Sequence, residues 1–224
     1  TAHHADFADR GHAHIFQEGI RIPPIRLYRE GVLLKDVMDL ILLNCQVPRE
    51  RLSDLRAQMA ANRLGVERMI ALCAKYGVDT VMAAGEALQD YAERRMRAGI
   101  AALPDGVYRF EDRFDNPEID GDLAFAVEIT VKGETMSLHF ESPPQVRAGL
   151  NMVYTALLST VYYAVKTVVD PQIPPNSGLS RPLTVTAPEG TVLNCISPAA
   201  VNGRVATCQR VVDLIHGALA KAAP

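Results

Sequence analysis

Histidine side chains gather at the amino end of the chain. Four of its six histidines lie within the first fourteen residues, at His3, His4, His12 and His14, and Asp6 stands between the two pairs. Neutral imidazole is a common metal ligand, and carboxylate oxygen is its usual companion where a hard cation is bound. Because alternate residues of an extended segment point to the same side, His12 and His14 could face one ion. A solvated loop is the alternative interpretation of this pair.

The composition bounds the class of protein. The chain has 224 residues, of which 48% are hydrophobic, and this is enough for a sizeable core. Its formal net charge of -3 argues against binding to nucleic acid or to a membrane surface. Its four cysteines form no CxxC pair, so we expect reduced thiols and a cytoplasmic protein. The most apolar stretch, 150–169, is interrupted by polar residues and predicts a buried helix rather than a membrane span.

Hydrophobic periodicity predicts the elements that position these side chains. Residues 1–31 are rich in glycine and proline, and we expect a loop with short extended pieces. The periodicity and turn residues that follow predict helices at 33–45, 49–77 and 79–102, strands at 107–114, 123–131 and 135–141, a helix at 145–169, a strand at 183–187 and a final helix. That final helix carries a predicted apolar stripe of Val205, Cys208, Val212, Ile215 and Leu219. The order predicts an α+β fold with a central antiparallel, hairpin-rich sheet.

A series of short motifs gives a second line of inference. In chain order they are AHHAD at 2–6, FQEGIRIPPIRLYREG at 16–31, SDLRAQMAA at 53–61, LPDGVYRFED at 103–112, PPQVRAGLN at 143–151, PPNSGLSRP at 174–182, TAPEGTVLN at 186–194 and SPAAV at 197–201. In this order they resemble the hydantoinase B/oxoprolinase family over nearly the whole chain. That family includes B subunits of ATP-dependent N-methylhydantoinases, the matching half of 5-oxoprolinase and related subunits of ketone carboxylases.

The resemblance implies that residues 1–224 are part of a longer domain. Family members normally carry an Asn-Asp-Pro stretch and a Gly-Gly-x-His-x-x-Asp stretch ahead of AHHAD, and a glycine-rich half after SPAAV. Neither occurs in this sequence. We therefore expect an internal piece of a longer protein, and we expect this piece to be inactive by itself.

The resemblance also implies a divalent metal, Zn²⁺ or Mn²⁺. The first histidine of AHHAD, His3, corresponds to a metal ligand, and the upstream His-x-x-Asp would supply its partners. We assign His4 a weaker ligand role. Asp6 is either a carboxylate that orients an imidazole or a residue that caps the loop.

Some positions depart from the family pattern and others keep it. His12 and His14 lie where the family has a longer glycine-containing loop, and they are either a compensating metal site or part of a solvated loop. His139 stands where relatives carry an aspartate, and it is either a changed catalytic group or an exposed polar residue on the strand. Glu18 is a candidate for charge pairing or substrate positioning, with a plain turn as the alternative.

Three further positions keep the pattern. We predict substrate contacts for Asn151, Asn176 and Arg181, and Arg181 could bind a carboxylate or phosphate. An exposed loop arginine is the alternative for Arg181.

Three functions are compatible with the sequence. The first is a subunit that opens a cyclic amide, of the hydantoin, 5-oxoproline or lactam type, after an A-type partner uses ATP to phosphorylate it. The second is a ketone carboxylase subunit that uses the same activation with bicarbonate or CO₂. The third is a diverged, non-catalytic scaffold that binds its partner. The sequence contains no GxGxxG or GxxxxGK[ST] phosphate loop, which fits ATP chemistry in a partner and a hetero-oligomer.

Overall fold

A four-stranded sheet forms the centre of the fold. The computed structural model describes residues 2–3, 11–116, 119 and 121–222. The strands β5 (Gly106–Phe114), β6 (Leu123–Lys132) and β7 (Thr135–Glu141) are antiparallel neighbours. β8 (Leu183–Thr186) joins the edge of β7 in parallel. The predicted α+β class is confirmed, with β8 making the sheet mixed.

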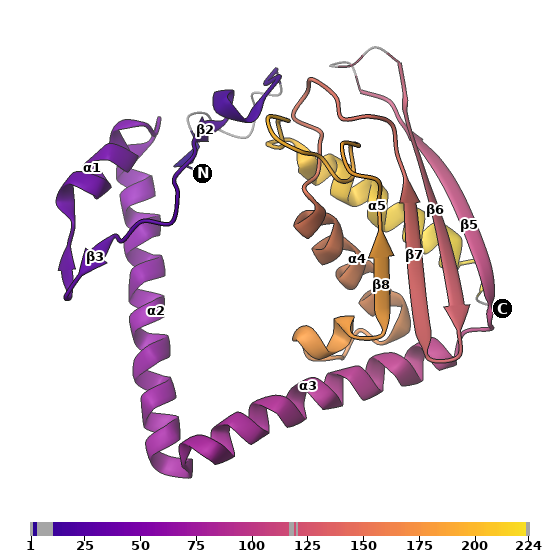
Figure 1. The fold of residues 1–224 in the computed structure, drawn as a ribbon, viewed down its shortest axis with the longest axis horizontal. Coiled ribbons are helices and arrows are strands. Elements are labelled where there is room, and N and C mark those ends of the chain that lie inside the picture. Colours follow the sequence, from indigo (N-terminus) through magenta and orange to yellow (C-terminus); the bar gives the residue numbers. More distant parts are fainter. Residues whose placement is uncertain (1, 4–10, 117–118, 120, 223–224) are drawn as a thin grey trace.

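One face of this sheet is buried and the other is open. Residues Phe125, Val127 and Ile129 of β6 alternate with exposed or half-buried neighbours, and Leu138 and Phe140 do the same on β7. Helices α4 (Tyr154–Val169) and α5 (Arg204–Leu219) cover the apolar face (Figure 1). The period of two in both strands thus places the core between the sheet and these two helices.

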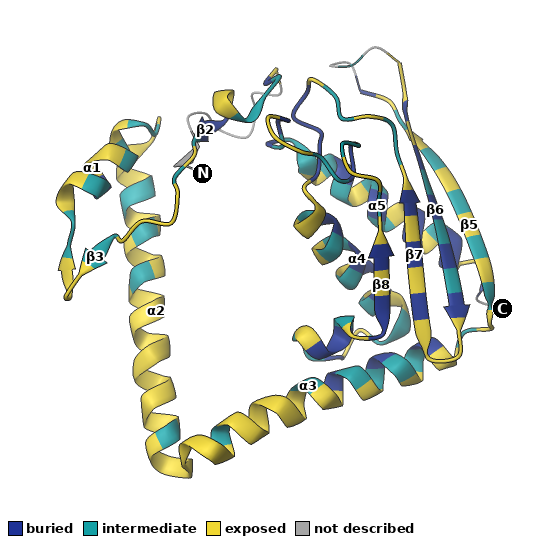
Figure 2. Cartoon of the chain, viewed as in Figure 1, coloured by how far each residue is buried: buried dark blue, intermediate teal, exposed yellow. Residues whose placement is uncertain are grey.

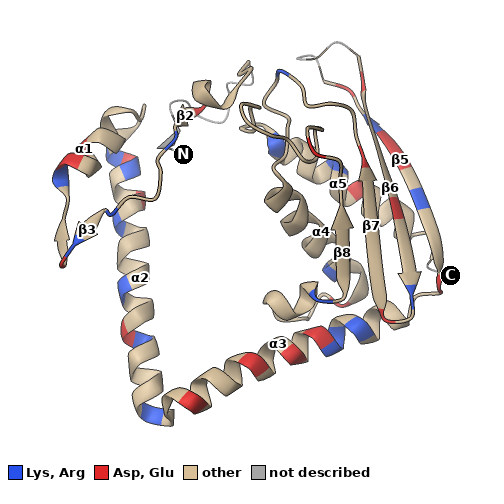
Figure 3. Cartoon of the chain, viewed as in Figure 1, with Lys and Arg blue, Asp and Glu red and all other residues tan. Residues whose placement is uncertain are grey.

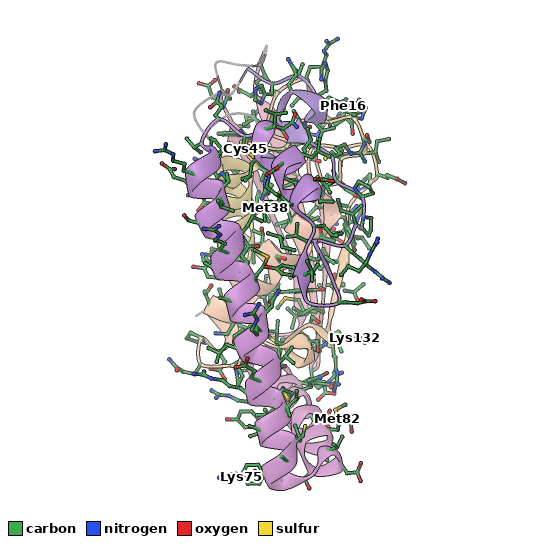
Figure 4. All side chains as sticks on the ribbon, turned by 90° about the vertical axis from the view of Figure 1, so that its left-hand side faces the viewer. Phe16, Met38, Cys45, Lys75, Met82 and Lys132 are labelled. Carbon is green, nitrogen blue, oxygen red and sulfur yellow. The ribbon has the colours of Figure 1, made fainter. Side chains whose placement is uncertain are left out.

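Two long helices extend away from this core. α2 (Pro48–Tyr76) and α3 (Val78–Ala101) meet at Gly77, whose φ of 84° lies in the left-handed region that glycine adopts without strain. No residue of α2 is buried, and α3 buries only Ala92, Met96 and Ile100, near its carboxyl end (Figure 2). Figure 4 shows Lys75 and Met82 near the junction of the two helices and Cys45 near the opposite end of α2.

The amino-terminal segment contains only short elements. β1 (Ala2–His3) pairs with β2 (Gly19–Ile20), and β3 (Tyr28–Arg29) pairs with β4 (Val32–Leu33). The 3₁₀ turn η1 (Ile15–Gln17) precedes β2, and α1 (Lys35–Leu43) follows β4 and lies beside the first half of α2 (Figure 1). A second 3₁₀ turn, η2 (Ser177–Ser180), lies against α3. The expectation of short extended pieces is confirmed over the described part of 1–31.

Two predictions about helices were wrong. The helix expected from 145 begins only at Tyr154, because the preceding backbone pairs with the loop at 187–195: Gln145 N donates to Gly190 O at 2.9 Å and Met152 N to Val192 O at 2.7 Å. In α5 the buried face includes only part of the predicted apolar stripe. Val205 is 46% exposed, whereas the buried residues include Val211, Leu214 and Ala218.

The cysteines are only partly buried. Cys45, Cys73 and Cys208 are all of intermediate exposure, and all are free thiols. No helix in the described part of the chain is both long enough and apolar enough to cross a membrane.

Candidate functional site

A buried glutamate fastens the amino-terminal segment to a loop that lies far away in the sequence. Glu18 is 2% exposed, and its Oε1 accepts hydrogen bonds from Val201 N at 2.7 Å and from Asn202 N at 2.6 Å. A buried carboxylate is costly unless donors surround it, and these two N–H groups lie just ahead of α5. Glu18 therefore joins η1 to the loop that precedes α5.

This contact also places the strand that carries the first family histidine. Glu18 immediately precedes β2, and in the β1–β2 pair His3 lies opposite Gly19 while Ala2 lies opposite Ile20. The backbone of His3 therefore lies opposite the residue that directly follows Glu18. The side chain of His3, and all of His4 and Asp6, lie outside the described residues.

A buried asparagine organises the same end of the sheet. Asn151 is fully buried, and its Oδ1 accepts a hydrogen bond from Val146 N at 2.8 Å. Its Nδ2 donates to the carbonyl oxygens of Val146, Ala148 and Ala200 at 2.8–2.9 Å. These contacts use the amide hydrogens of Asn151 within the protein, so Asn151 shapes the loops. The substrate contact predicted for it stays a prediction.

Two of the predicted ligand histidines lie beside this junction. His12 is buried, and the backbone of His14 forms a bridge with Ala199. Ile15 N then donates to Pro198 O at 2.8 Å. The Nδ1 atom of His14 is buried and makes no hydrogen bond with any residue that the structure describes. A nitrogen of this kind is a candidate metal ligand.

The described residues do not complete a metal site. Within the described ranges, no three side chains of His, Cys, Asp or Glu gather closely enough to hold an ion. A protein zinc site usually takes three or four protein ligands. His12 and His14 with their described neighbours therefore do not form such a site by themselves.

A pocket of about 310 Å³ opens between the amino-terminal segment and the loop at 195–201. Its wall comes from three parts of the chain: Ile15, Arg21 and Ile22, then Val153, and then Cys195, Ile196, Ser197, Ala199 and Val201. Burial raises the pKa of the Cys195 thiol above its ordinary value, and the negative charge of Glu18 adds to the rise. Cys195 is therefore a protonated thiol at neutral pH and not an activated nucleophile.

The remaining predicted substrate contacts lie at the other end of the sheet. The guanidinium of Arg181 pairs with Asp90 at 2.7 Å and with Glu93 at 2.8 Å, both on α3. The Asn176 side chain accepts from Gly178 N and donates to Leu88 O. Both residues thus fix η2 against α3, and Figure 1 shows this junction at the opposite end of β8 from the Glu18 loops.

His139 lies apart from both groups. It is exposed on the open face of β7, opposite Glu128 on β6, and its Nδ1 lies 2.8 Å from the hydroxyl of Thr186 on β8. The expected exposed position on the non-core face is confirmed. The catalytic role proposed for His139 stays a prediction.

The structure brings together residues that motif spacing did not single out. Arg21 and Cys195 are 174 positions apart and line one pocket. Arg21 belongs to the motif at 16–31, so the motif itself was the available signal. Nothing in the pattern around Cys195 indicated that it lies beside the amino-terminal segment.

Comparisons with known proteins agree with this architecture. The chain is 35% identical to the B subunit of a putative D-/L-hydantoinase of Pseudomonas sp. (strain NS671), with 100% of this chain and 41% of that protein covered. It is 35% identical to the beta subunit of the caprolactamase of Pseudomonas jessenii, with 94% and 37% covered. The chain thus spans less than half the length of these curated relatives.

Solved structures show the same fold. The crystal structure of ATP-dependent caprolactamase from Pseudomonas jessenii matches with a TM-score of 0.89 at 34% identity, over 97% of this chain and 38% of that one. A nucleotide-free acetone carboxylase matches with a TM-score of 0.81 over 87% of this chain and 28% of that one, and its 19% identity shows the fold alone.

The family assignment follows from the match along the whole chain. The sequence pattern that describes the Hydantoinase B/oxoprolinase family matches residues 1–224. Ala2 and His3 of the AHHAD motif lie opposite Ile20 and Gly19, and Gly19 is the last residue of the QEG motif. The chain belongs to the hydantoinase B/oxoprolinase family.

Proposed function

We propose that this chain is part of the B-type component of an ATP-dependent enzyme that hydrolyses a cyclic amide. The observation that carries the proposal is the agreement with a caprolactamase structure over 97% of this chain, at a TM-score of 0.89. Relatives named for hydantoinase, caprolactamase and 5-oxoprolinase activity support the same class of substrate. In each case the bond to be broken is an amide within a ring.

The proposed reaction divides between two proteins. Curated relatives are named as B or beta subunits, which supports a partner, and we propose that an A-type partner uses ATP. Phosphorylation of the amide oxygen would make the ring carbon open to attack by water. Loss of the ring nitrogen from the water adduct would break the C–N bond and leave an acyl phosphate, and a second water at the same carbon would release the carboxylate and inorganic phosphate. Glu18 and Asn151 would support this step by fixing the loop at 195–202, which forms one wall of the pocket.

A metal ion remains a proposal for the intact protein. The described residues do not assemble three ligands, and His3 would be one ligand among others in the intact protein. The test is the metal content of protein that has been purified without chelator. His3→Gln is expected to lower bound Zn²⁺ or Mn²⁺, and His216→Gln, near the carboxyl end of α5, is the matched control. An equal metal content in both variants would remove His3 as a ligand.

The experiment for the function is reconstitution with the A-type partner. The intact protein and its partner are incubated with ATP and, separately, with hydantoin, 5-oxoproline and caprolactam, and ring opening is followed by mass spectrometry. We expect opening of at least one ring that requires ATP and both proteins.

Parallel reactions distinguish cyclic-amide hydrolysis from the other two candidate functions, a ketone carboxylase subunit and a non-catalytic scaffold. Acetone with bicarbonate is tested in the same way, since an acetone carboxylase shares the fold. ATP-dependent carboxylation without ring opening would favour a ketone carboxylase. Ring opening by the partner alone would favour a non-catalytic scaffold.

A further inference from the structure

The pocket between the amino-terminal segment and the loop at 195–201 has no role assigned so far. Backbone contacts fix its walls on both sides: Ile15 N bonds to Pro198 O, and Cys195 N bonds to Met152 O at 2.9 Å. The Glu18 carboxylate fastens the same junction. Several hydrogen bonds therefore hold the walls of the pocket.

Arg21 gives this pocket a positive charge. Its side chain is exposed, and no carboxylate of the described residues pairs with it. Its guanidinium lies 5.8 Å from the ring centre of Phe16, so the aromatic face helps to orient it. Arg95 and Arg181, in contrast, are each paired with acidic side chains. Arg21 is the one arginine among the described residues that line this pocket.

The rest of the wall is mostly apolar. Ile22, Val153 and Ile196 contribute hydrocarbon, and Ser197 contributes a hydroxyl group. A pocket with an apolar body and one cationic end suits a small compound that has a compact ring or chain and one anionic group. The volume of about 310 Å³ exceeds that of a five-membered lactam with a carboxylate.

The chain enters the pocket wall directly after the strand that pairs with β1. Ile20 lies opposite Ala2 in the β1–β2 pair, and Arg21 is the next residue. Arg21 is therefore two residues along the chain from Gly19, which lies opposite the backbone of His3. Arg181, in contrast, is already paired with carboxylates on α3.

We propose that this pocket binds a small amide-derived ligand and that Arg21 pairs with its anionic group. The assignment rests on the proposed cyclic-amide function, because that function supplies two sources for the anion. One is a carboxylate on the substrate, as in 5-oxoproline, and the other is the phosphoryl group of the activated amide. Arg21 is the residue that would distinguish such anionic ligands from uncharged ones.

Protection of Cys195 from alkylation tests the proposal without any catalytic step. The intact protein is treated with a limiting alkylating reagent, and peptide mass spectrometry reports modification at Cys195 and at Cys73. Cys73 lies on α2 and does not line the pocket, so it is the internal control. The probes are 5-oxoproline, 2-pyrrolidinone, which is the same ring without the carboxylate, and inorganic phosphate.

We expect 5-oxoproline, inorganic phosphate or both to slow alkylation of Cys195 and to leave Cys73 unchanged. Protection by 5-oxoproline alone identifies a substrate carboxylate, and protection by phosphate identifies the phosphoryl group. Arg21→Gln should weaken the protecting ligand roughly tenfold or more, because it removes a charge-assisted hydrogen bond. Arg26→Gln makes the same change in charge outside the pocket and should keep the protection.

Three results would overturn the proposal: no protection by either anion, equal protection by 2-pyrrolidinone, or unchanged protection in Arg21→Gln. Circular dichroism of each variant checks that the fold is retained. Because this measurement needs neither ATP nor the partner, its failure leaves the proposed hydrolase function standing. Protection without ring opening in the reconstituted enzyme would contradict that function alone.

Discussion

At the scale of single residues, Glu18 and Asn151 fix the loop that precedes α5, a role that their sequence contexts did not indicate. Each is buried, and each satisfies backbone groups that come from segments far apart in the chain. An unsatisfied buried N–H or C=O group costs free energy comparable to a lost hydrogen bond. These two side chains therefore help to hold the loops around the pocket in place.

Replacing Glu18 by Gln tests the first of these contacts. The amide keeps the size of the side chain but loses the charge that strengthens the bonds from Val201 N and Asn202 N. We expect the free energy of unfolding to fall by about 1–2 kcal/mol. Denaturant titration measures it, and Glu67→Gln on the exposed face of α2 is the control, expected to change it by less than about 0.5 kcal/mol. Equal effects in the two variants would refute the buried contact.

The change Asn151→Asp tests the second contact. Aspartate has the same shape but no N–H group, and it would place carboxylate oxygen against the carbonyl oxygens of Ala148 and Ala200. We expect a loss of about 3 kcal/mol or more in the free energy of unfolding. Asn62→Asp, exposed on α2, should be nearly neutral. A stable Asn151→Asp protein would show that the three donor contacts are not formed.

The raised pKa of the Cys195 thiol leads us to predict how its rate of alkylation depends on pH. Because its pKa is raised, a smaller fraction is thiolate at any pH below that value than in a free cysteine. Alkylation of Cys195 should therefore be slower than that of N-acetylcysteine amide between pH 7 and 8, and the midpoint of its rate profile should lie at a higher pH. Rates measured by peptide mass spectrometry from pH 7 to 10 check this. A midpoint below that of N-acetylcysteine amide would contradict the buried position.

At the scale of elements, the sheet and the long helix α2 differ sharply in how far their apolar side chains are buried. Leu138 of β7 is 1% exposed, whereas Leu64 of α2 is 46% exposed. We expect Leu138→Ala to lower the free energy of unfolding by about 2–5 kcal/mol, because it leaves a cavity in the core. Leu64→Ala should change it by less than about 0.5 kcal/mol.

Thermal or denaturant unfolding of the two leucine variants compares them directly. Similar losses would mean that α2 packs against the remainder of the described chain as tightly as the sheet does. A small loss in Leu138→Ala would contradict the position of the core between the sheet and the helices α4 and α5.

Local patterns predicted the elements well but not the connections between them. The alternation in 123–131 and 135–141 gave β6 and β7 nearly to the residue, since one face of each strand is buried. The start of α4 was missed because Gln145 and Met152 bond to a loop some forty residues later, which no local pattern encodes. Arg181 was expected to bind an anion, and its partners on α3 became visible only in the folded chain.

At the scale of the whole molecule, the chain forms an open frame. The helices α2 and α3 separate α1 from the sheet, whereas the segment at 11–22 contacts the loop that precedes α5 (Figure 1). Charges are unevenly divided, with mainly basic side chains along α2 and acidic ones along the first half of α3 (Figure 3). The caprolactamase chain shares this frame over 97% of the present chain, so the arrangement also occurs in a longer, solved relative.

The most direct measurement of the central claim follows the oxygen atom of the amide. If the partner phosphorylates that oxygen and water then opens the ring, the oxygen leaves with phosphate. We therefore use the lactam that is opened in the reconstituted enzyme, labelled with ¹⁸O at its carbonyl, and analyse the released phosphate by mass spectrometry. The account predicts one ¹⁸O atom in the phosphate for each ring opened, only when ATP and both proteins are present. Ring opening with unlabelled phosphate would contradict activation of the amide, and label release without the present protein would contradict its part in the reaction.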